Sequence, residues 1–250
     1  MLTLALLFVA ALWAGTQNAL AGGGSFITLP ALLLSGMDPR MANITSTLAL
    51  FPGQATAGFA GYRLIGAANG LSVGTLVLLS FVGGAFGGLL LLATPTDFFE
   101  QLLPWLMLVA TALFAWGSFR RPAERAVLGP LPAGLAQLAI GVYGGYFGGG
   151  IGFLMMAVLT MAGLGVRTAL ATKNVLAAVM NGAAVLIFLF LPGIDWTKVA
   201  VVAAGAMAGG LLGSWAIHRV DERALRLGVV GLGIGLTIML FLRQQGIIAW

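Results

Sequence analysis

The sequence predicts an all-α polytopic membrane protein with two inverted-topology repeats, each a glycine-rich broken or re-entrant helical hairpin followed by three transmembrane helices. Of the 250 residues, 60% are hydrophobic and only 8% are charged, with a mean hydropathy of +1.05. A soluble domain carries about 25% charged residues. Two apolar segments are too long for one span, and both are interrupted by glycines. Finally, the Lys and Arg residues define an orientation only if each of these segments returns to its side of entry.

The first element is an apolar segment over residues 2–35. As one straight helix its 34 residues would extend about 51 Å, well beyond the ~30 Å hydrocarbon core. Residues 15–18 and the run Gly22-Gly23-Gly24-Ser25 interrupt it. We therefore expect two halves of roughly a dozen residues, each about 20 Å long. No basic region precedes the apolar run, so we interpret the segment as structure and not as a signal peptide.

The remaining elements follow from the later apolar runs. Spans are expected at 43–62, 71–92 and 101–118, which completes the first repeat, residues 1–119. The longest polar stretch marks a linker at 120–130. A second long segment, 131–163, is interrupted at Gly141 and over residues 144–150. Further spans at 170–191, 197–217 and 224–243 complete the second repeat, residues 131–250.

Three matched blocks, in the same order, indicate the duplication. The glycine run 22–24 lies 126 residues before the run 148–150. Residues 40–47 align with 167–174, with the Arg, the Ala and the first Thr identical. Gly83, Gly87 and Gly88 align with Gly205, Gly209 and Gly210.

The positive-inside rule chooses between two topologies. If each long segment crosses once, six basic residues lie on either side and no orientation results. If each is a hairpin without net crossing, nine lie on one side and three (Arg40, Lys198, Arg243) on the other. This places both termini in the periplasm and the linker 120–130 in the cytoplasm. A helical pair that crosses fully and returns gives the same count, so re-entrant and fully crossing hairpins both stay open.

Composition excludes several kinds of activity. With no Cys and one His, His218, the chain offers no cluster of metal ligands, and we expect neither a metal nor another cofactor. A membrane enzyme would need a nucleophile with a base, which His218 alone does not supply. The net charge of +5 fits membrane orientation and does not indicate nucleic acid. All seven acidic residues lie in loops or at span ends, so no carboxylate proton relay is visible.

The glycine breaks are the first candidates for a binding site, because irregular backbone at membrane depth is tolerated only in protein or along a cavity. Each break is followed by a helix whose N-terminus favours an anion. Polar side chains on the following spans are the expected donors, and Lys173 is the one cation among them. The candidate substrate-binding residues are Gly22, Gly23, Gly24, Ser25, Asn43, Thr45, Thr47, Gln54, Tyr143, Gly148, Gly149, Gly150, Ile151, Lys173, Asn174 and Asn181.

Each candidate also has a purely structural interpretation. The glycines could serve only close helix packing, and the amides only interhelical hydrogen bonds. Lys173 could extend its amine to the cytoplasmic interface.

The motifs together resemble the TauE/SafE sulfite exporter family over essentially the whole chain. The resemblance is carried by the segments 21–26, 30–32, 42–53, 62–63, 143–152 and 173–182. It implies a multi-pass permease of the bacterial inner membrane for a small anion, with sulfite or an organosulfonate as the exported substrate. Together with the inverted repeats, it leads us to expect alternating access around a site near the midplane. An anion channel, or a carrier for another small organic anion, is the alternative. The sequence leaves the anion, the coupling and the oligomeric state open.

Overall fold

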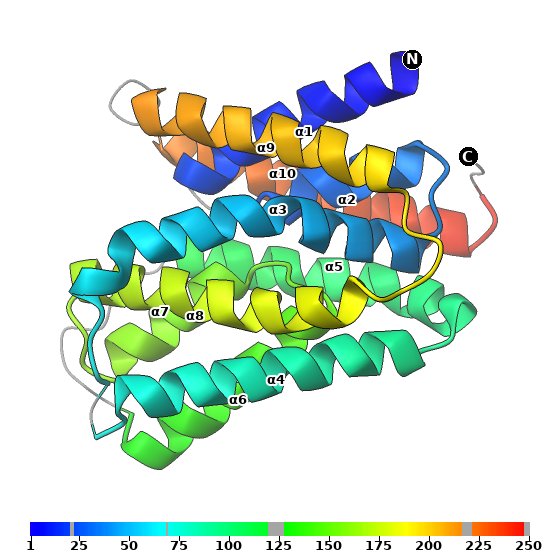
Figure 1. Ribbon diagram of the computed structural model, residues 1–250. Coiled ribbons are helices and arrows are strands. Elements are labelled where there is room, and N and C mark those ends of the chain that lie inside the picture. The colour runs from blue at the N-terminus through cyan, green and yellow to red at the C-terminus, as the bar shows by residue number, and fades with distance from the viewer. Residues whose placement is uncertain (21–22, 69, 120–127, 217–221, 248–250) are drawn as a thin grey trace. The chain divides into compact units, whose positions relative to one another are not determined.

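The described part of the chain is helical throughout, as predicted. The computed structural model describes residues 1–20, 23–68, 70–119, 128–216 and 222–247 (Figure 1). Within these ranges there are no strands, and one isolated bridge joins Ala68 and Leu71. The helices are α1 (Leu2–Leu20), α2 (Ser25–Leu34), α3 (Pro39–Gly61), the 3-10 turn η1 (Tyr62–Leu64), α4 (Val73–Ala93), α5 (Thr96–Phe119), α6 (Pro130–Tyr146), α7 (Ile151–Met161), α8 (Val166–Phe188), α9 (Trp196–Ala216) and α10 (Glu222–Gln244).

Five of the described helices are long and apolar enough to cross a membrane, namely α4, α5, α8, α9 and α10. The expected span 43–62 is helical, as α3, but is not among them. The physical reason is its polar first half, which carries Asn43, Thr45, Ser46 and Thr47. Residues 42–46 and 48–50 of α3 are buried within the protein. Burial in protein allows a polar helix to lie at membrane depth.

The chain forms two compact units, and each draws helices from both halves of the sequence. The first unit comprises residues 1–53, 94–115 and 191–250, and therefore holds α1, α2, the start of α3, most of α5, α9 and α10. The second unit comprises 54–93 and 116–190, with the end of α3, η1, α4, α6, α7 and α8.

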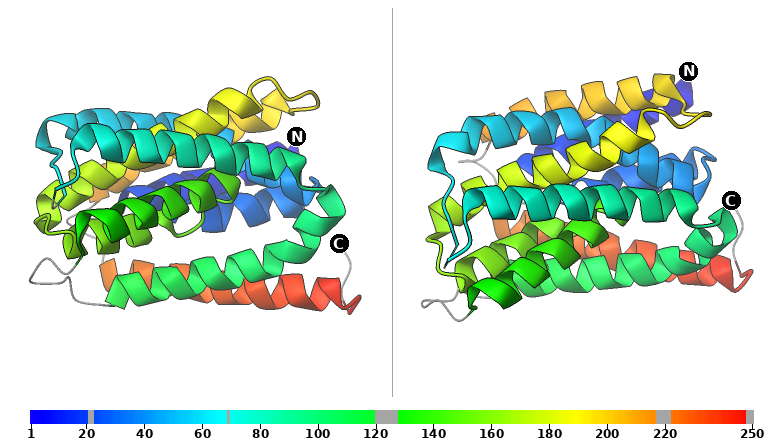
Figure 2. Two further views of the ribbon diagram at one scale, coloured as in Figure 1. Left: turned by 90° about the horizontal axis from the view of Figure 1, so that it is seen from below. Right: turned by 60° about the horizontal axis from the view of Figure 1, so that its bottom comes forward.

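One helix pair dominates the packing in each unit. In the first unit α1 lies along α9 (Figure 1). A Cβ added to Gly205 of α9 would lie 2.6 Å from the carbonyl oxygen of Phe8, so the two backbones touch. In the second unit α4 lies along α6 (Figure 2). A Cβ on Gly83 of α4 would lie 2.8 Å from the carbonyl oxygen of Leu138. Such close approach is the usual use of small residues between membrane helices.

The two long segments do break at the glycine runs, but their arms are unequal. We expected halves of roughly a dozen residues, and this is wrong. The arms have 19 and 10 residues in α1 and α2, and 17 and 11 in α6 and α7. At 1.5 Å per residue they extend about 28, 15, 26 and 17 Å.

The earlier glycines do not interrupt the helices because they are packing positions. Gly15 lies in α1 directly against the backbone of Ala206, and Gly141 lies in α6 against Gly83. A glycine inside a helix costs about 1 kcal/mol relative to alanine. Here close packing against a second helix offsets that cost, so each helix continues to the later glycine run.

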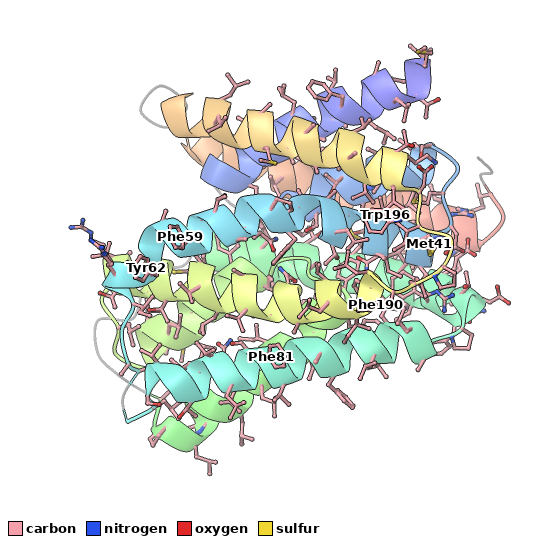
Figure 3. All side chains as sticks on the ribbon, in the orientation of Figure 1. Met41, Phe59, Tyr62, Phe81, Phe190 and Trp196 are labelled. Atoms are coloured by element: carbon pink, nitrogen blue, oxygen red, sulfur yellow. The ribbon has the colours of Figure 1, made fainter. Side chains whose placement is uncertain are left out.

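The outer surface carries large apolar side chains. Phe59, Phe81, Phe190 and Trp196 are all exposed (Figure 3). A water-soluble protein rarely leaves so many large apolar residues uncovered. The apolar surface and the five apolar helices together indicate a lipid-facing protein.

Candidate functional site

In the second unit, the break between α6 and α7 leaves backbone donors without partners. Gly148 and Gly150 adopt φ values of 82° and 74°, a left-handed conformation that glycine reaches without strain. The chain then enters α7 at Ile151. Within the described residues, the N–H groups of Ile151 and Gly152 donate to no acceptor. Unpaired N–H groups at a helix start, together with the helix dipole, favour an anion.

Lys173 of α8 brings its ammonium group to this helix start. Its Nζ lies 3.6 Å from the position that a Cβ on Gly152 would occupy, and the residue is partly buried. Among the described residues no carboxylate lies within 4.0 Å of it, and it makes no hydrogen bond. Asn174 follows on α8, is partly buried, and has no side-chain hydrogen bond in the described structure. A cation and backbone donors thus meet without a negative partner.

Gln54 and Asn181, also in the second unit, bond to one another. The Nδ2 of Asn181 donates to the Oε1 of Gln54 at 2.6 Å, and Asn181 is buried. This bond joins the end of α3 to α8. For this pair the structure therefore shows an interhelical hydrogen bond, which was the alternative to a role in substrate binding.

In the first unit, the break between α1 and α2 is closed by a side chain. Gly23 has φ 85°, and the Oδ1 of Asn18 accepts a hydrogen bond from the backbone N–H of Gly24 at 3.3 Å. Ser25 begins α2. Candidate Gly22 lies outside the described residues, as do His218 and most of the linker, residues 120–127.

The start of α3 contributes the polar side chains of the first unit. Asn43 and Thr45 are buried, and the Oγ1 of Thr45 has no hydrogen-bond partner in the described structure. Thr47 is partly buried, and its Oγ1 donates to the carbonyl oxygen of Asn43 at 3.0 Å. Ser46 reaches the first turns of α2, where its hydroxyl lies 2.6 Å from that of Thr28. The candidate residues thus form two groups, one in each unit.

The two groups use equivalent residues. Ser46 and Lys173 occupy matching positions in the aligned blocks 40–47 and 167–174. Each contacts the beginning of the short helix that follows the glycine run, α2 in one case and α7 in the other. The contacting group is a neutral hydroxyl in the first unit and an ammonium in the second. The arrangement is repeated, but the charge is not.

One candidate that sequence reasoning missed is Gln17. Its side chain is buried in α1 and its Nε2 has no hydrogen-bond partner in the described structure. Tyr143, which was a candidate, has an equally buried and unpartnered Oη. The two residues are 126 residues apart, as are the two glycine runs. That separation was the signal available in the sequence.

Comparison with known proteins agrees with this arrangement. The family model of the sulfite exporter TauE/SafE matches residues 7–240. The chain belongs to the TauE/SafE sulfite exporter family. This confirms the resemblance inferred from the motifs.

Curated relatives of this TauE/SafE member are similar over nearly their whole length. A "Probable membrane transporter protein" of Haemophilus influenzae is 31% identical over 239 residues, covering 94% of this chain and 92% of that protein. "Probable membrane transporter protein ORF9" of a Sinorhizobium species is 31% identical over 240 residues, covering 95% and 92%. "Probable membrane transporter protein YfcA" of Escherichia coli K12 is 30% identical over 235 residues, covering 92% and 86%. The chain is thus a multi-pass membrane transporter and not an enzyme, as predicted.

Proposed function

We propose that this TauE/SafE protein exports a small oxyanion, sulfite or an organosulfonate, across the bacterial inner membrane. The observation that carries the proposal is the ammonium of Lys173 beside the unpaired N–H groups at the start of α7. An ammonium and two backbone N–H groups, all of them donors, are suited to the oxygen atoms of an anion. The family name, which specifies sulfite, supports this class of substrate.

Both groups of candidate residues take part in one transport cycle. In the second unit Gly149, Gly150 and Ile151 supply backbone donors, while the N–H of Gly148 already donates to the carbonyl oxygen of Tyr143 at 3.3 Å. Lys173, Asn174 and Tyr143 supply side chains. In the first unit the corresponding residues are Gly22 to Ser25 with Asn43, Thr45 and Thr47. Of these, the N–H of Gly24 and the hydroxyl of Thr47 already donate within the protein and would have to change partner to bind an anion. Gln54 and Asn181 complete the set by holding α3 against α8.

The two halves of the sequence are inverted repeats, residues 1–119 and 131–250, that alternate access to the anion. The equivalent use of Gly83 against α6 and Gly205 against α1 supports the duplication. The short arms α2 and α7, of about 15 and 17 Å, reach roughly half of the hydrocarbon core, which supports re-entry on that side of each hairpin. The long arms α1 and α6, of about 28 and 26 Å, extend over most of it. The charge count supports periplasmic termini and a cytoplasmic linker.

The test is efflux of sulfite from proteoliposomes, with sulfate, thiosulfate, sulfoacetate and taurine as competitors. We expect saturable flux with preference for sulfite or a sulfonate. Lys173→Ala and Asn174→Ala are expected to reduce kcat/KM about 10–100-fold for the lysine and less for the amide, because a hydrogen bond from a charged donor contributes about 1.5–3 kcal/mol. Lys198→Ala, which removes the lysine that faces Asp195 on α9, is the control and should transport normally.

Unchanged flux in both site variants would contradict the assignment of Lys173 and Asn174. High unitary conductance without saturation would favour the anion channel instead of a carrier. Absence of sulfite flux from intact protein would move the assignment to another small organic anion.

A further inference from the structure

Lys173 is surrounded by elements that carry no acid. The elements packed against α8 in the second unit are the end of α3, η1, α4, α6 and α7. Their titratable or charged residues are the tyrosines 62, 143 and 146 and the exposed Arg63; α8 itself adds the exposed Arg167. None of these groups is an anion when the tyrosines are protonated. The nearest electrostatic feature is the start of α7, which is itself the positive end of a helix.

An anion beside the ammonium of Lys173 would stabilise it in this place. Removing a charge from water without a partner costs several kcal/mol, and a neighbouring positive helix end adds to the cost. Lysine, unlike arginine, can avoid the cost by losing its proton. Two states of the site are therefore favourable. One is an empty site with a neutral amine, and the other is an occupied site with an ammonium and an anion.

We propose that Lys173 binds a proton together with the transported anion, so that the protein moves one proton and one monovalent anion in the same direction. On binding, the neutral amine takes a proton from water on that side and the ammonium pairs with the anion. On release to the other side, the anion leaves and the proton follows it. Atoms and charge balance, and the loaded and empty sites are both neutral. This inference rests on the proposed function.

The equivalent position in the first unit supports a stoichiometry of one proton per anion. Ser46 takes the place of Lys173 there and pairs with the hydroxyl of Thr28. The repeat therefore supplies the same contact with the helix start without a second titrating cation. One proton per anion is expected, and the membrane potential should not act on the neutral loaded or empty form.

The experiment measures proton uptake when an anion binds to the purified full-length protein. Titration calorimetry in two buffers of different ionisation enthalpy gives the number of protons bound. The probes are sulfite and methanesulfonate, and the second is decisive because a sulfonate does not itself titrate between about pH 6 and about pH 10, where lysine does. We expect about one proton per methanesulfonate at alkaline pH, and an affinity that falls about tenfold per pH unit there.

Substitutions of Lys173 test separately the effect of its positive charge and the effect of its titratable proton. Lys173→Arg keeps a cation that cannot deprotonate, so it should bind methanesulfonate without proton uptake, and its flux should become sensitive to an imposed potential. Lys173→Gln should lose at least tenfold in affinity. Lys198→Arg on α9 is the matched control and should keep the proton uptake of the wild type.

The possible failures are distinguishable. Binding of methanesulfonate without proton uptake in the wild type would overturn the coupling and leave the anion transporter standing. Unchanged proton uptake in a folded Lys173→Arg variant would also overturn it, by placing the proton on another group. If neither probe binds to intact wild-type protein, the proposed substrate class fails and the inference fails with it.

Discussion

At the residue scale, two buried polar groups just before the glycine runs lack hydrogen-bond partners in the described structure. Gln17 and Tyr143 each lie in the long arm of a hairpin, at equivalent distances before the glycine runs. An unpaired buried donor costs about 1–3 kcal/mol. Because both matching positions carry this cost, we infer that the two side chains donate hydrogen bonds during transport.

Replacing Tyr143 tests whether its hydroxyl has such a role. Tyr143→Phe removes the unpaired Oη, so we expect thermal stability in detergent to rise by up to about 1 kcal/mol, while kcat/KM for the anion falls several-fold. Thr111→Val is the matched control, since Thr111 of α5 is also buried, with an Oγ1 that lacks a partner in the described structure, and is not among the candidate site residues. It should raise stability alone. Normal transport by a stabilised Tyr143→Phe variant would mean that the hydroxyl has no part in binding.

At the scale of the element, glycine performs two separate tasks. Gly23, Gly148 and Gly150 have positive φ and turn the chain between the arms of the hairpins. Gly15, Gly83, Gly141 and Gly205 lie inside helices and allow backbones to meet. The same residue type therefore ends one helix and continues another, and the difference lies in what packs against it.

Neighbouring glycines on α9 make this distinction measurable. Gly205→Ala would place a Cβ 2.6 Å from the carbonyl oxygen of Phe8, and we expect a loss of about 1–3 kcal/mol of stability. Gly210→Ala meets nothing within 4 Å, so it should be neutral or gain up to about 1 kcal/mol from helix propensity. Thermal unfolding in one detergent compares the two directly. Equal effects would show that α1 and α9 do not touch as described.

At the scale of the whole molecule, the compact units do not follow the order of the chain. Each hairpin packs with a helix from the other half of the sequence, α1 with α9 and α6 with α4. Neither half of the sequence alone can then bury the glycine faces of its own helices. Separately expressed halves would leave those faces uncovered.

The orientation of the chain can be checked by cysteine labelling, because the protein has no Cys of its own. Ala67→Cys and Thr197→Cys place thiols at exposed positions in loops or at helix starts. The charge distribution predicts that position 67 is cytoplasmic and position 197 periplasmic. A membrane-impermeant maleimide should therefore label intact spheroplasts at 197, and at 67 only after permeabilisation. The reverse pattern would invert the predicted topology.

Much of the fold was predictable because apolar runs and glycine runs are local signals. The long segments, their breaks and all six later helices lie close to the expected residues. The arm lengths were not predictable, since whether Gly15 or Gly141 interrupts a helix depends on a partner distant in sequence. For the same reason the polarity of α3 became understandable only when its burial was known.

The candidate site, too, was only partly predictable from the sequence. Lys173 and the glycine runs were found from residue type and spacing alone. That Asn181 bonds Gln54, that Gln17 is buried without a partner in the described structure, and that Lys173 reaches Gly152 required coordinates. A side chain's partner depends on which helices pack together, and helix pairing is not encoded in the period of one helix.

The sequence by itself determined the class of protein, the family, the glycine breaks and the cation, because hydropathy, charge and local motifs are properties of neighbouring residues. Only the tertiary structure decided that α1 pairs with α9 and α4 with α6, and that Lys173 lies beside the start of α7 without an acid in the described elements packed around it. The physical reason is that backbone contacts at glycine and the solvation of a charge both depend on residues far apart in the chain.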